Sequence, residues 1–301
     1  MNEHQERVDS IAIANTAGLV ITGSFDTDVK VWSLAQEAVE RDLSGHICGV
    51  NYVAVSDDGS RVVSASDCGP LRLWNPRDGS VLGVFLSDPG PYPVVSVTAD
   101  GAHALTCFAC SELCIWDLST LRVVRSFDVA QFHSCSADMT ASGKRAVLGG
   151  LDGPVRVLDL DSGNLLHTLE RHGGEVRHVA ITQDGTIAAS AAEDGVLCVW
   201  DLHRGVKLTE FSAELGYKSG APIALKNGLV VSDDGSIVAT INNDRSLTAW
   251  RVRPPCGAVT VRGDHPFVCC AVSSDGQLLL VGDAAGGVHF LHTTDPAPKG
   301  N

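Results

Sequence analysis

The sequence of 301 residues predicts an all-β fold, a seven-bladed β-propeller whose last blade lacks its outer strand. The main observation is a tryptophan, or a leucine in its place, at intervals of 42, 42, 42, 42, 50 and 41 residues. The positions are Trp32, Trp74, Trp116, Leu158, Trp200, Trp250 and Leu291. The second observation is an Asp-Gly turn that returns with the same period. Repeats of about 40 to 45 residues are typical of propeller blades, each a four-stranded sheet.

Composition narrows the class of protein. The chain is 44% hydrophobic, which is ample for a large core, and equal repeats leave no room for a linker, so we expect one domain. A net charge of −14 argues against nucleic-acid binding, which normally requires a basic face. The polar amino terminus, MNEHQERVDS, has no apolar signal region, and no stretch is long enough to span a bilayer. We therefore expect a cytoplasmic protein without a nucleic-acid or membrane partner.

The second repeat shows the strands of one blade most plainly. After Gly45-His46 come an apolar strand at 50–55, a turn ending in Asp58-Gly59, a second strand at 61–66 and a third at 70–74. Asp-Gly permits the positive φ of a tight hairpin, and it recurs at 100–101, 184–185, 234–235 and 275–276. In chain order, the predicted blades lie at 4–43, 46–85, 88–127, 130–169, 172–211, 225–261 and 263–292, followed by a polar tail at 293–301.

This repeat resembles the WD-repeat family over nearly the whole chain. In that family, four residues of a blade form one buried hydrogen-bonded chain, here called the tetrad: a His before the first strand, a Ser or Thr in the second, an Asp in the next turn and the Trp of the third. Since a buried donor without a partner costs about 1 to 3 kcal/mol, only a complete chain stabilises. The resemblance implies complete tetrads in blade one, with His4, Thr22, Asp26 and Trp32, and in blade five, with His172, Ser190, Asp194 and Trp200.

The other blades keep the tetrad only in part. Blade two has His46, Ser64 and Trp74 with Cys68 at the Asp position, and blade three has Thr106 and Trp116 with Cys110 there and Asp88 at the His position. Blade four keeps Asp152 alone, blade six keeps Thr240, Asp244 and Trp250, and blade seven keeps none. We interpret the losses as apolar replacement of whole networks, which is nearly neutral when all partners go together. The eight extra residues before Trp250 are expected in a loop at 212–224.

The cysteines and histidines do not predict a metal-binding or catalytic site. Ten cysteines scattered through a chain with a large core are expected to be thiols, mostly buried, in a reducing compartment. Cys107, Cys110 and Cys114 lie across two strands and a turn, with no second pair at zinc-site spacing. No Ser, Cys or carboxylate is arranged with a histidine as a nucleophilic set, and no phosphate-binding loop occurs. We expect no catalytic residue, metal or cofactor.

The last predicted blade has only three strands, near 267–272, 278–281 and 287–291. The following residues, HTTDPAPKGN, make a poor fourth strand because of their prolines, and only three residues precede His4. An unpaired sheet edge invites aggregation, and proteins usually cover it. We therefore expect that upstream residues of a longer protein supply the missing strand, with a three-stranded blade as the alternative.

The resemblance also implies a binding face. In the family, partner proteins commonly dock on the narrow end of the ring, where the turns between second and third strands emerge. Carried over by position, the face comprises Phe25, Asp67, Leu151, Glu193 and Asn243 from the turns, and Arg7, Asp9, Asn51, His133, Glu175, Arg177 and Asn227 from the first strands. Phe25 is either an exposed hot spot or is packed over the channel.

The resemblance implies a non-catalytic function, as a platform for protein–protein interaction or as a sensing and regulatory domain. The degenerate blades and the closing phrase VGDAAGGVHFLH at 281–292 are also similar to the carboxy-terminal propellers of NACHT or Apaf-type signalling ATPases. That narrower likeness implies an amino-terminal signalling module in a parent protein. The alternative from another class is a propeller enzyme with its site at the channel mouth, which needs several carboxylates converging there.

Overall fold

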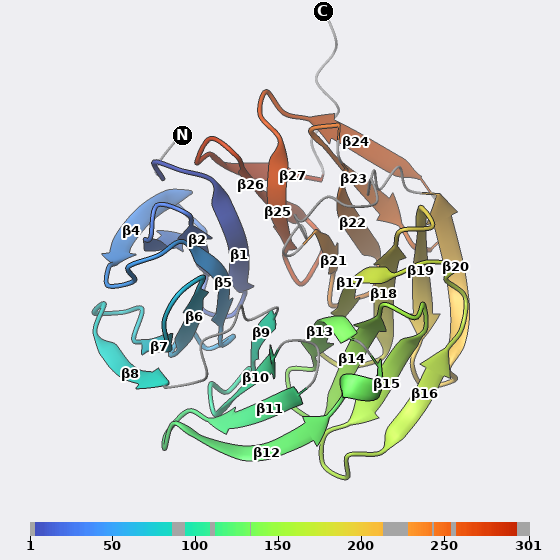
Figure 1. Cartoon of the computed structure of the whole chain (residues 1–301). Coiled ribbons are helices and arrows are strands. Elements are labelled where there is room, and N and C mark those ends of the chain that lie inside the picture. The colour runs from blue at the N-terminus through green and yellow to red at the C-terminus, as the bar shows by residue number, and fades with distance from the viewer. Residues whose placement is uncertain are drawn as a thin grey trace, which may run out of the picture.

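The computed structural model describes residues 4–85, 94–108, 112–132, 134–212, 228–242, 244–253 and 257–293. These residues form six four-stranded antiparallel sheets and one three-stranded sheet, arranged as blades around a central channel (Figure 1). In every blade the strands lie in chain order from the channel to the rim. The predicted seven-bladed all-β propeller is confirmed, and so is the three-stranded last sheet. The expected loop at 212–224 lies almost wholly outside the described residues.

The innermost strand of each blade lines the channel. These strands are β1 (Val8–Ala14), β5 (Val50–Val55), β9 (Val94–Val97), β13 (Ser134–Met139), β17 (Val176–Ile181), β21 (Leu229–Val231) and β25 (Phe267–Val272). They are rich in Val, Ile and Ala because they pack against neighbouring blades on both faces. Five of the six residues of β5 are buried.

The second and third strands carry most of the core. The second strands are β2 (Leu19–Ser24), β6 (Val62–Ser66), β10 (His103–Phe108), β14 (Arg145–Gly150), β18 (Ile187–Ala192), β22 (Ile237–Asn242) and β26 (Leu278–Asp283). The third strands are β3 (Val29–Ser33), β7 (Leu71–Trp74), β11 (Glu112–Asp117), β15 (Val155–Asp159), β19 (Val196–Asp201), β23 (Ser246–Arg251) and β27 (Val288–His292). The periodic tryptophans Trp32, Trp74, Trp116, Trp200 and Trp250 are all buried between blades.

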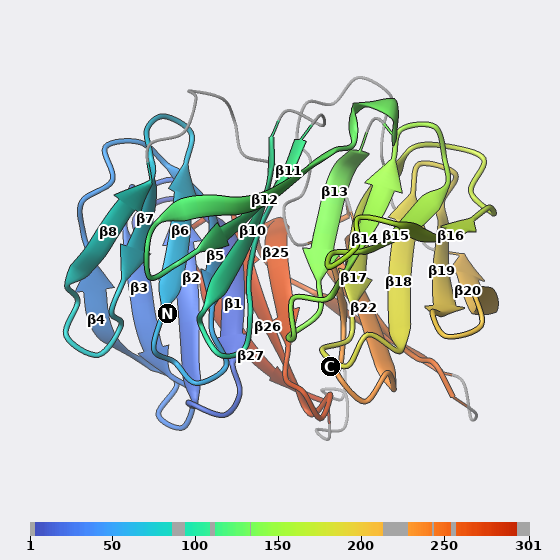
Figure 2. The ribbon, with the colours of Figure 1, turned by 90° about the horizontal axis from the view of Figure 1, so that it is seen from below.

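The outer strands face solvent. They are β4 (Ala38–Leu43), β8 (Val81–Phe85), β12 (Arg122–Asp128), β16 (Leu165–Leu169), β20 (Val206–Ser212) and β24 (Ala258–Arg262). A short 3-10 helix, η1 (Ala130–Phe132), precedes β13. Seen from the side, the blades stand beside one another with their connections on two opposite faces (Figure 2). No helix in the described part of the chain is long and apolar enough to cross a membrane.

Hydrogen bonds between the turns that join first and second strands run from blade to blade around the channel. We call this set the turn ring. Its links, in order, are Ala17 N to Asp57 O (3.1 Å), Asp58 N to Ala99 O (3.4 Å), Ala99 N to Ala141 O (2.9 Å), Ala141 N to Gln183 O (3.1 Å), Gln183 N to Asp233 Oδ1 (3.2 Å), Asp234 N to Ser274 O (3.4 Å) and Ser274 N to Asn15 Oδ1 (3.0 Å). The last link joins blade seven to blade one, so the ring is closed.

Candidate functional site

The tetrad residues of blades one and five form the hydrogen-bonded chains that the WD-repeat resemblance implies. In blade one, His4 Nε2 lies 2.8 Å from Thr22 Oγ1, His4 Nδ1 lies 2.9 Å from Asp26 Oδ2, and Trp32 Nε1 donates to Thr22 Oγ1 at 2.9 Å. The same aspartate accepts the backbone N–H of Gln5 at 2.9 Å. Burial lowers the pKa of His4, so its imidazole is neutral at pH 7.

Blade five repeats this arrangement with a serine. His172 Nε2 lies 2.7 Å from Ser190 Oγ, Trp200 Nε1 donates to the same oxygen at 2.8 Å, and His172 Nδ1 lies 3.3 Å from the Asp194 carboxylate. Asp194 also accepts the backbone N–H of Gly173 at 2.9 Å. In both blades, therefore, the aspartate ties the loop that enters the blade to the turn between its second and third strands.

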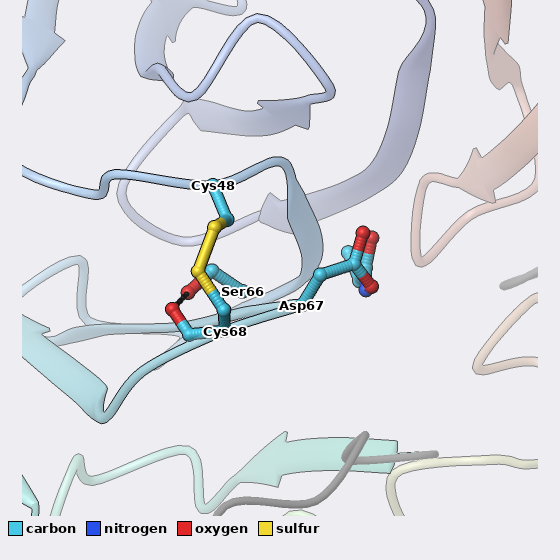
Figure 3. The surroundings of a disulfide bond; sticks show 5 residues. Cys48, Ser66, Asp67 and Cys68 are labelled. Atoms are coloured by element: carbon cyan, nitrogen blue, oxygen red, sulfur yellow. Dashed lines mark hydrogen bonds between the residues drawn. A yellow bond between two sulfur atoms is a disulfide. The ribbon is translucent and has the colours of Figure 1, made fainter.

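A disulfide bond makes this connection in blade two. Cys68, at the tetrad Asp position, is bonded to Cys48 in the entering loop, and Figure 3 shows the pair beside Ser66 and Asp67. His46 and Trp74 still bind Ser64 Oγ, at 2.6 and 2.8 Å. The expectation that the cysteines are thiols is therefore wrong for this pair. The physical reason is position, since Cys48 follows His46 in the entering loop and Cys68 lies in the turn after the second strand, so the fold brings the two residues, 20 apart in sequence, together.

The remaining cysteines in the described residues are buried thiols. They are Cys107, Cys114, Cys198, Cys269 and Cys270. Burial raises the pKa of Cys198 to about 11, so this thiol stays protonated at neutral pH. No group of three or more His, Cys, Asp or Glu side chains is placed to hold a metal ion within the described ranges. Cys110 lies outside those ranges.

The degenerate blades use ion pairs that the sequence analysis missed. In blade four, Asp152 pairs with Arg156, whose guanidinium lies 4.6 Å from the centroid of the Phe132 ring. In blade seven, buried Asp283 lies 2.7 Å from His289. The interpretation of purely apolar replacement is therefore wrong for these two blades. A basic or imidazole side chain in the third strand, four or six residues after an aspartate, was the available signal.

Blade six differs from its expected partial tetrad. Thr240 donates its hydroxyl to the backbone carbonyl of Gly228 at 2.8 Å. Asp244 accepts from Arg262 at 2.6 Å, in an ion pair between the third-strand turn and the outer strand. The aspartate therefore ties different elements together than Asp26 and Asp194 do.

Phe25 stands on the face where the turns between second and third strands emerge. Its side chain is 47% exposed, and its ring rests against the backbone of Gly49, where an added Cβ would lie 2.7 Å from it. The guanidinium of Arg7 lies 5.4 Å from the ring centroid. Phe25 is therefore a supported, half-exposed aromatic side chain. Ile47, in the loop that the disulfide holds, is 83% exposed.

The charged members of the predicted face are paired with one another. Arg7 Nε donates to Asp9 Oδ1 at 2.6 Å, and Asn51 binds Asp67. On the far side of the channel, Arg177 donates to Glu193 at 2.7 Å and also pairs with Glu175. Leu151 is exposed on blade four. Three further predicted members, His133, Asn227 and Asn243, lie outside the described residues.

The channel contains a cavity of about 300 Å³ whose wall is formed by the innermost strands. Asp138 lies in this wall and accepts hydrogen bonds from Ser96 Oγ (3.0 Å), its neighbour Met139 N (2.8 Å) and Ile181 N (3.1 Å). Burial raises its pKa to about 6. The carboxylate thus connects blades three, four and five, which is a structural role.

Comparisons with known proteins agree with this geometry. The family described as "WD domain, G-beta repeat" matches residues 1–33, 38–75 and 163–201, which include the first three strands of blades one, two and five, the blades with a histidine in place. The chain is 22% identical over 289 residues to Autophagy-related protein 16 of Arabidopsis thaliana, covering 95% of this chain and 56% of that protein. It is 27% identical over 293 residues to Cross-pathway control WD-repeat protein 2 of Flammulina velutipes, covering 93% and 91%.

A third relative is Meiotic recombination protein rec14 of Schizosaccharomyces pombe, 25% identical over 209 residues, or 68% of each chain. None of these three names describes an enzymatic activity, and none is that of a NACHT or Apaf-type protein. The chain spans about half the length of the Arabidopsis relative.

Proposed function

We propose that this chain, a β-propeller with WD40 repeats, is a non-catalytic platform that binds another protein on the face bearing Phe25. Propellers of this family generally bind proteins, and three segments of the chain match its repeat. The tetrads and the disulfide fix the turns of that face, so the binding residues are held in place before a partner arrives. Such preorganisation lowers the entropic cost of association.

The observation that carries the proposal is the environment of Phe25. An aromatic side chain that is 47% exposed, held between Arg7 and Gly49 and bordered by paired charges, has the features of an interface anchor. Ile47, exposed nearby in blade two, adds apolar area to the same side of the face. Arg177 and Glu193 offer a polar rim across the channel.

The test is affinity capture from a native lysate followed by mass spectrometry, with wild type and the double variant Phe25→Ala, Glu193→Arg. We expect the partners of the wild type to be lost from the double variant. The matched control is Val124→Ala, Glu40→Arg, which changes an exposed apolar and an exposed acidic residue on outer strands. Equal partner recovery by wild type and the face variant would remove the face from consideration.

A second form of the proposal is a sensing or regulatory propeller inside a larger cytoplasmic signalling protein. Its support is that the Arabidopsis relative is longer than the matched region, which covers 56% of it. The NACHT or Apaf-type parent finds no support among the relatives named above. Sequencing of the complete transcript tests this form, because further coding sequence joined to the propeller in the same reading frame is its expected result.

The enzyme alternative has weaker support. Its site requires several carboxylates that converge on the channel mouth without structural partners. Asp138 accepts three hydrogen bonds and Asp233 accepts one from the turn ring, so both have structural partners. Arg177 is engaged with two glutamates. We therefore propose a binding function only.

A further inference from the structure

Blade seven has an open edge at β27. Among the described residues, the sheet ends there, with the order β25-β26-β27. Every other blade has an outer strand at the same position. This edge lies at the rim of the ring and away from the face that bears Phe25, so the inference below does not depend on the proposed function.

The backbone of β27 has a row of hydrogen-bonding groups on the side where no strand of the described residues pairs with it. Asp283 N donates to Gly287 O and Thr293 N donates to Gln277 O, both at 2.9 Å, and these bonds set which amides of β27 point toward β26. Because directions alternate along an antiparallel strand, residues 289 and 291 also point toward β26. The N–H and C=O groups of Val288, Phe290 and His292 therefore point outward, along the open edge.

The six complete blades define what fits this position. In each, the last part of the outer strand places a bulky apolar residue opposite the first or second residue of the third strand; we call it the anchor. The anchor pairs are Leu43 with Val29, Phe85 with Leu71, Phe127 with Leu113, Leu169 with Val155, Phe211 with Leu197 and Val261 with Leu247. By register with β26, the equivalent of Val29 in blade seven is Val288.

Side chains of β27 are more exposed than their equivalents in blades that have an outer strand. The second residue of the third strand, Lys30 in blade one and Arg156 in blade four, has a side chain only 11% exposed, whereas that of His289 is 39% exposed. Phe290 and Leu291 are likewise half-buried, although the equivalent residues of blade one are fully buried. A fourth strand would bury this apolar surface.

The residue before the anchor is acidic in two of the six complete blades. In blade one it is Asp42, which binds Lys30 at 2.6 Å across the pair, in blade five it is Glu210, and in the other four blades it is uncharged. The residue that it would face in blade seven is His289, whose other contacts are Asp283 and the Phe267 ring. An acidic residue is therefore well placed beside the imidazole.

We propose that the open edge of β27 binds an extended segment of a second polypeptide, which adds as the fourth antiparallel strand and carries an acidic residue directly before a Leu or Phe anchor. The acidic-anchor pair occurs in this chain as Asp42-Leu43 and Glu210-Phe211. Main-chain bonds supply affinity in this mode of recognition, and the anchor supplies register.

The probe is a labelled peptide with the sequence of residues 37–44, EAVERDLS, which is the outer strand of blade one with its flanks. It is titrated into the 301-residue chain by fluorescence polarisation. Hydrogen exchange is measured on the same complex. We expect saturable binding and new protection of the amides of Val288, Phe290 and His292.

Matched peptides test the geometry without changing the protein. Arg41 lies opposite Val31 and points its N–H at the third strand, whereas the Asp42 N–H points away. N-methylation at the Arg41 position should weaken binding about tenfold, because a hydrogen bond is lost and the methyl group obstructs the edge. N-methylation at Asp42 should change the affinity of the peptide by less than about threefold, since no hydrogen bond to the edge is removed. Leu43→Asp in the peptide should abolish binding.

Three results would overturn the proposal. One is protection of the Val288, Phe290 and His292 amides in the protein alone at low concentration, which means that the chain covers its own edge. Another is protection that grows with protein concentration without peptide, which means that a second copy covers it. The third is equal weakening by both N-methylated peptides, or protection of β3 in place of β27, which means that the peptide binds elsewhere.

Discussion

Four buried histidines, His4, His46, His172 and His178, make the stability of the ring depend on pH. Burial lowers the pKa of each of them, and in His46 burial together with the charge of Arg72 lowers it to about 4. The folded protein keeps His46 neutral, while the unfolded chain takes up a proton below about pH 6.5. Its contribution to stability is therefore complete above that pH and is lost as the pH falls toward 4.

We predict that His46→Gln flattens the pH dependence of unfolding. Between pH 6 and pH 4.5, the free energy of unfolding of the wild type should fall more steeply than that of the variant, by up to about 1.4 kcal/mol per pH unit. Urea titrations at four pH values measure both slopes. The carboxyl of Asp138, with its pKa raised to about 6, contributes in the opposite sense in both proteins and cancels in the difference. Parallel curves would contradict the neutral, buried state of His46.

At the residue scale, side-chain contacts could be predicted from the sequence where each side chain has a single role. His4, Thr22, Asp26 and Trp32 could be assigned because their residue types and offsets match those of the WD-repeat family, which the chain resembles. Other contacts depend on neighbours that sequence does not bring together. The exposure of Phe25 depends on Gly49 in the next blade, and the pairing of Arg156 with the Phe132 ring depends on the path of η1.

At the scale of the element, the disulfide of blade two replaces the aspartate of the tetrad. Removing it with Cys48→Ala, Cys68→Ser should lower the free energy of unfolding by about 3 kcal/mol, because the closed loop spans about 20 residues. Chemical denaturation without reductant measures this loss. Addition of reductant should destabilise the wild type and leave the variant unchanged.

A second double variant tests whether an aspartate at the tetrad Asp position can replace the disulfide. Cys48→Ala, Cys68→Asp places a carboxylate where Asp26 and Asp194 stand, within reach of His46. It should recover part of the lost stability, whereas the serine at that position should not. Alkylation of thiols in intact cells tests the expected reducing compartment, since modified Cys48 and Cys68 would show that the bond is open there. No recovery with aspartate would mean that blade two differs from blades one and five in its loop geometry.

The strands themselves follow closely from sequence, because alternating burial and Asp-Gly turns are local signals. The Cys48 to Cys68 bond was missed because composition alone suggested thiols, although Cys68 occupies the tetrad Asp position. That alignment, together with a second cysteine two residues after His46, was a usable signal. The ion pairs of blades four and seven join a turn to a third strand, and sequence spacing alone did not separate them from solvent-exposed charges.

At the scale of the whole molecule, the number of blades was predictable and the closure was not. The period of the tryptophans counts blades even where leucine replaces them. The turn ring, by contrast, uses mostly backbone groups, which leave no mark on residue type. Side-chain acceptors take part at three places, at Asp57, which accepts from Thr16 N, at Asp233 and at Asn15. The Asn15 link joins the last blade, whose described residues form three strands, to the first.

We predict that Asn15→Ala loosens the ring at this junction. Loss of the acceptor for the Ser274 N–H should lower the free energy of unfolding by about 1 kcal/mol. In a ring of repeats each blade is stabilised mainly by its neighbours, so opening should begin at the weakened junction. Hydrogen exchange should therefore rise first in β1 and β25. The matched control is Gln183→Ala, because Gln183 holds the same place in blade five but bonds through its backbone alone. If both variants are equally stable and exchange alike, the side chain of Asn15 does not hold the junction.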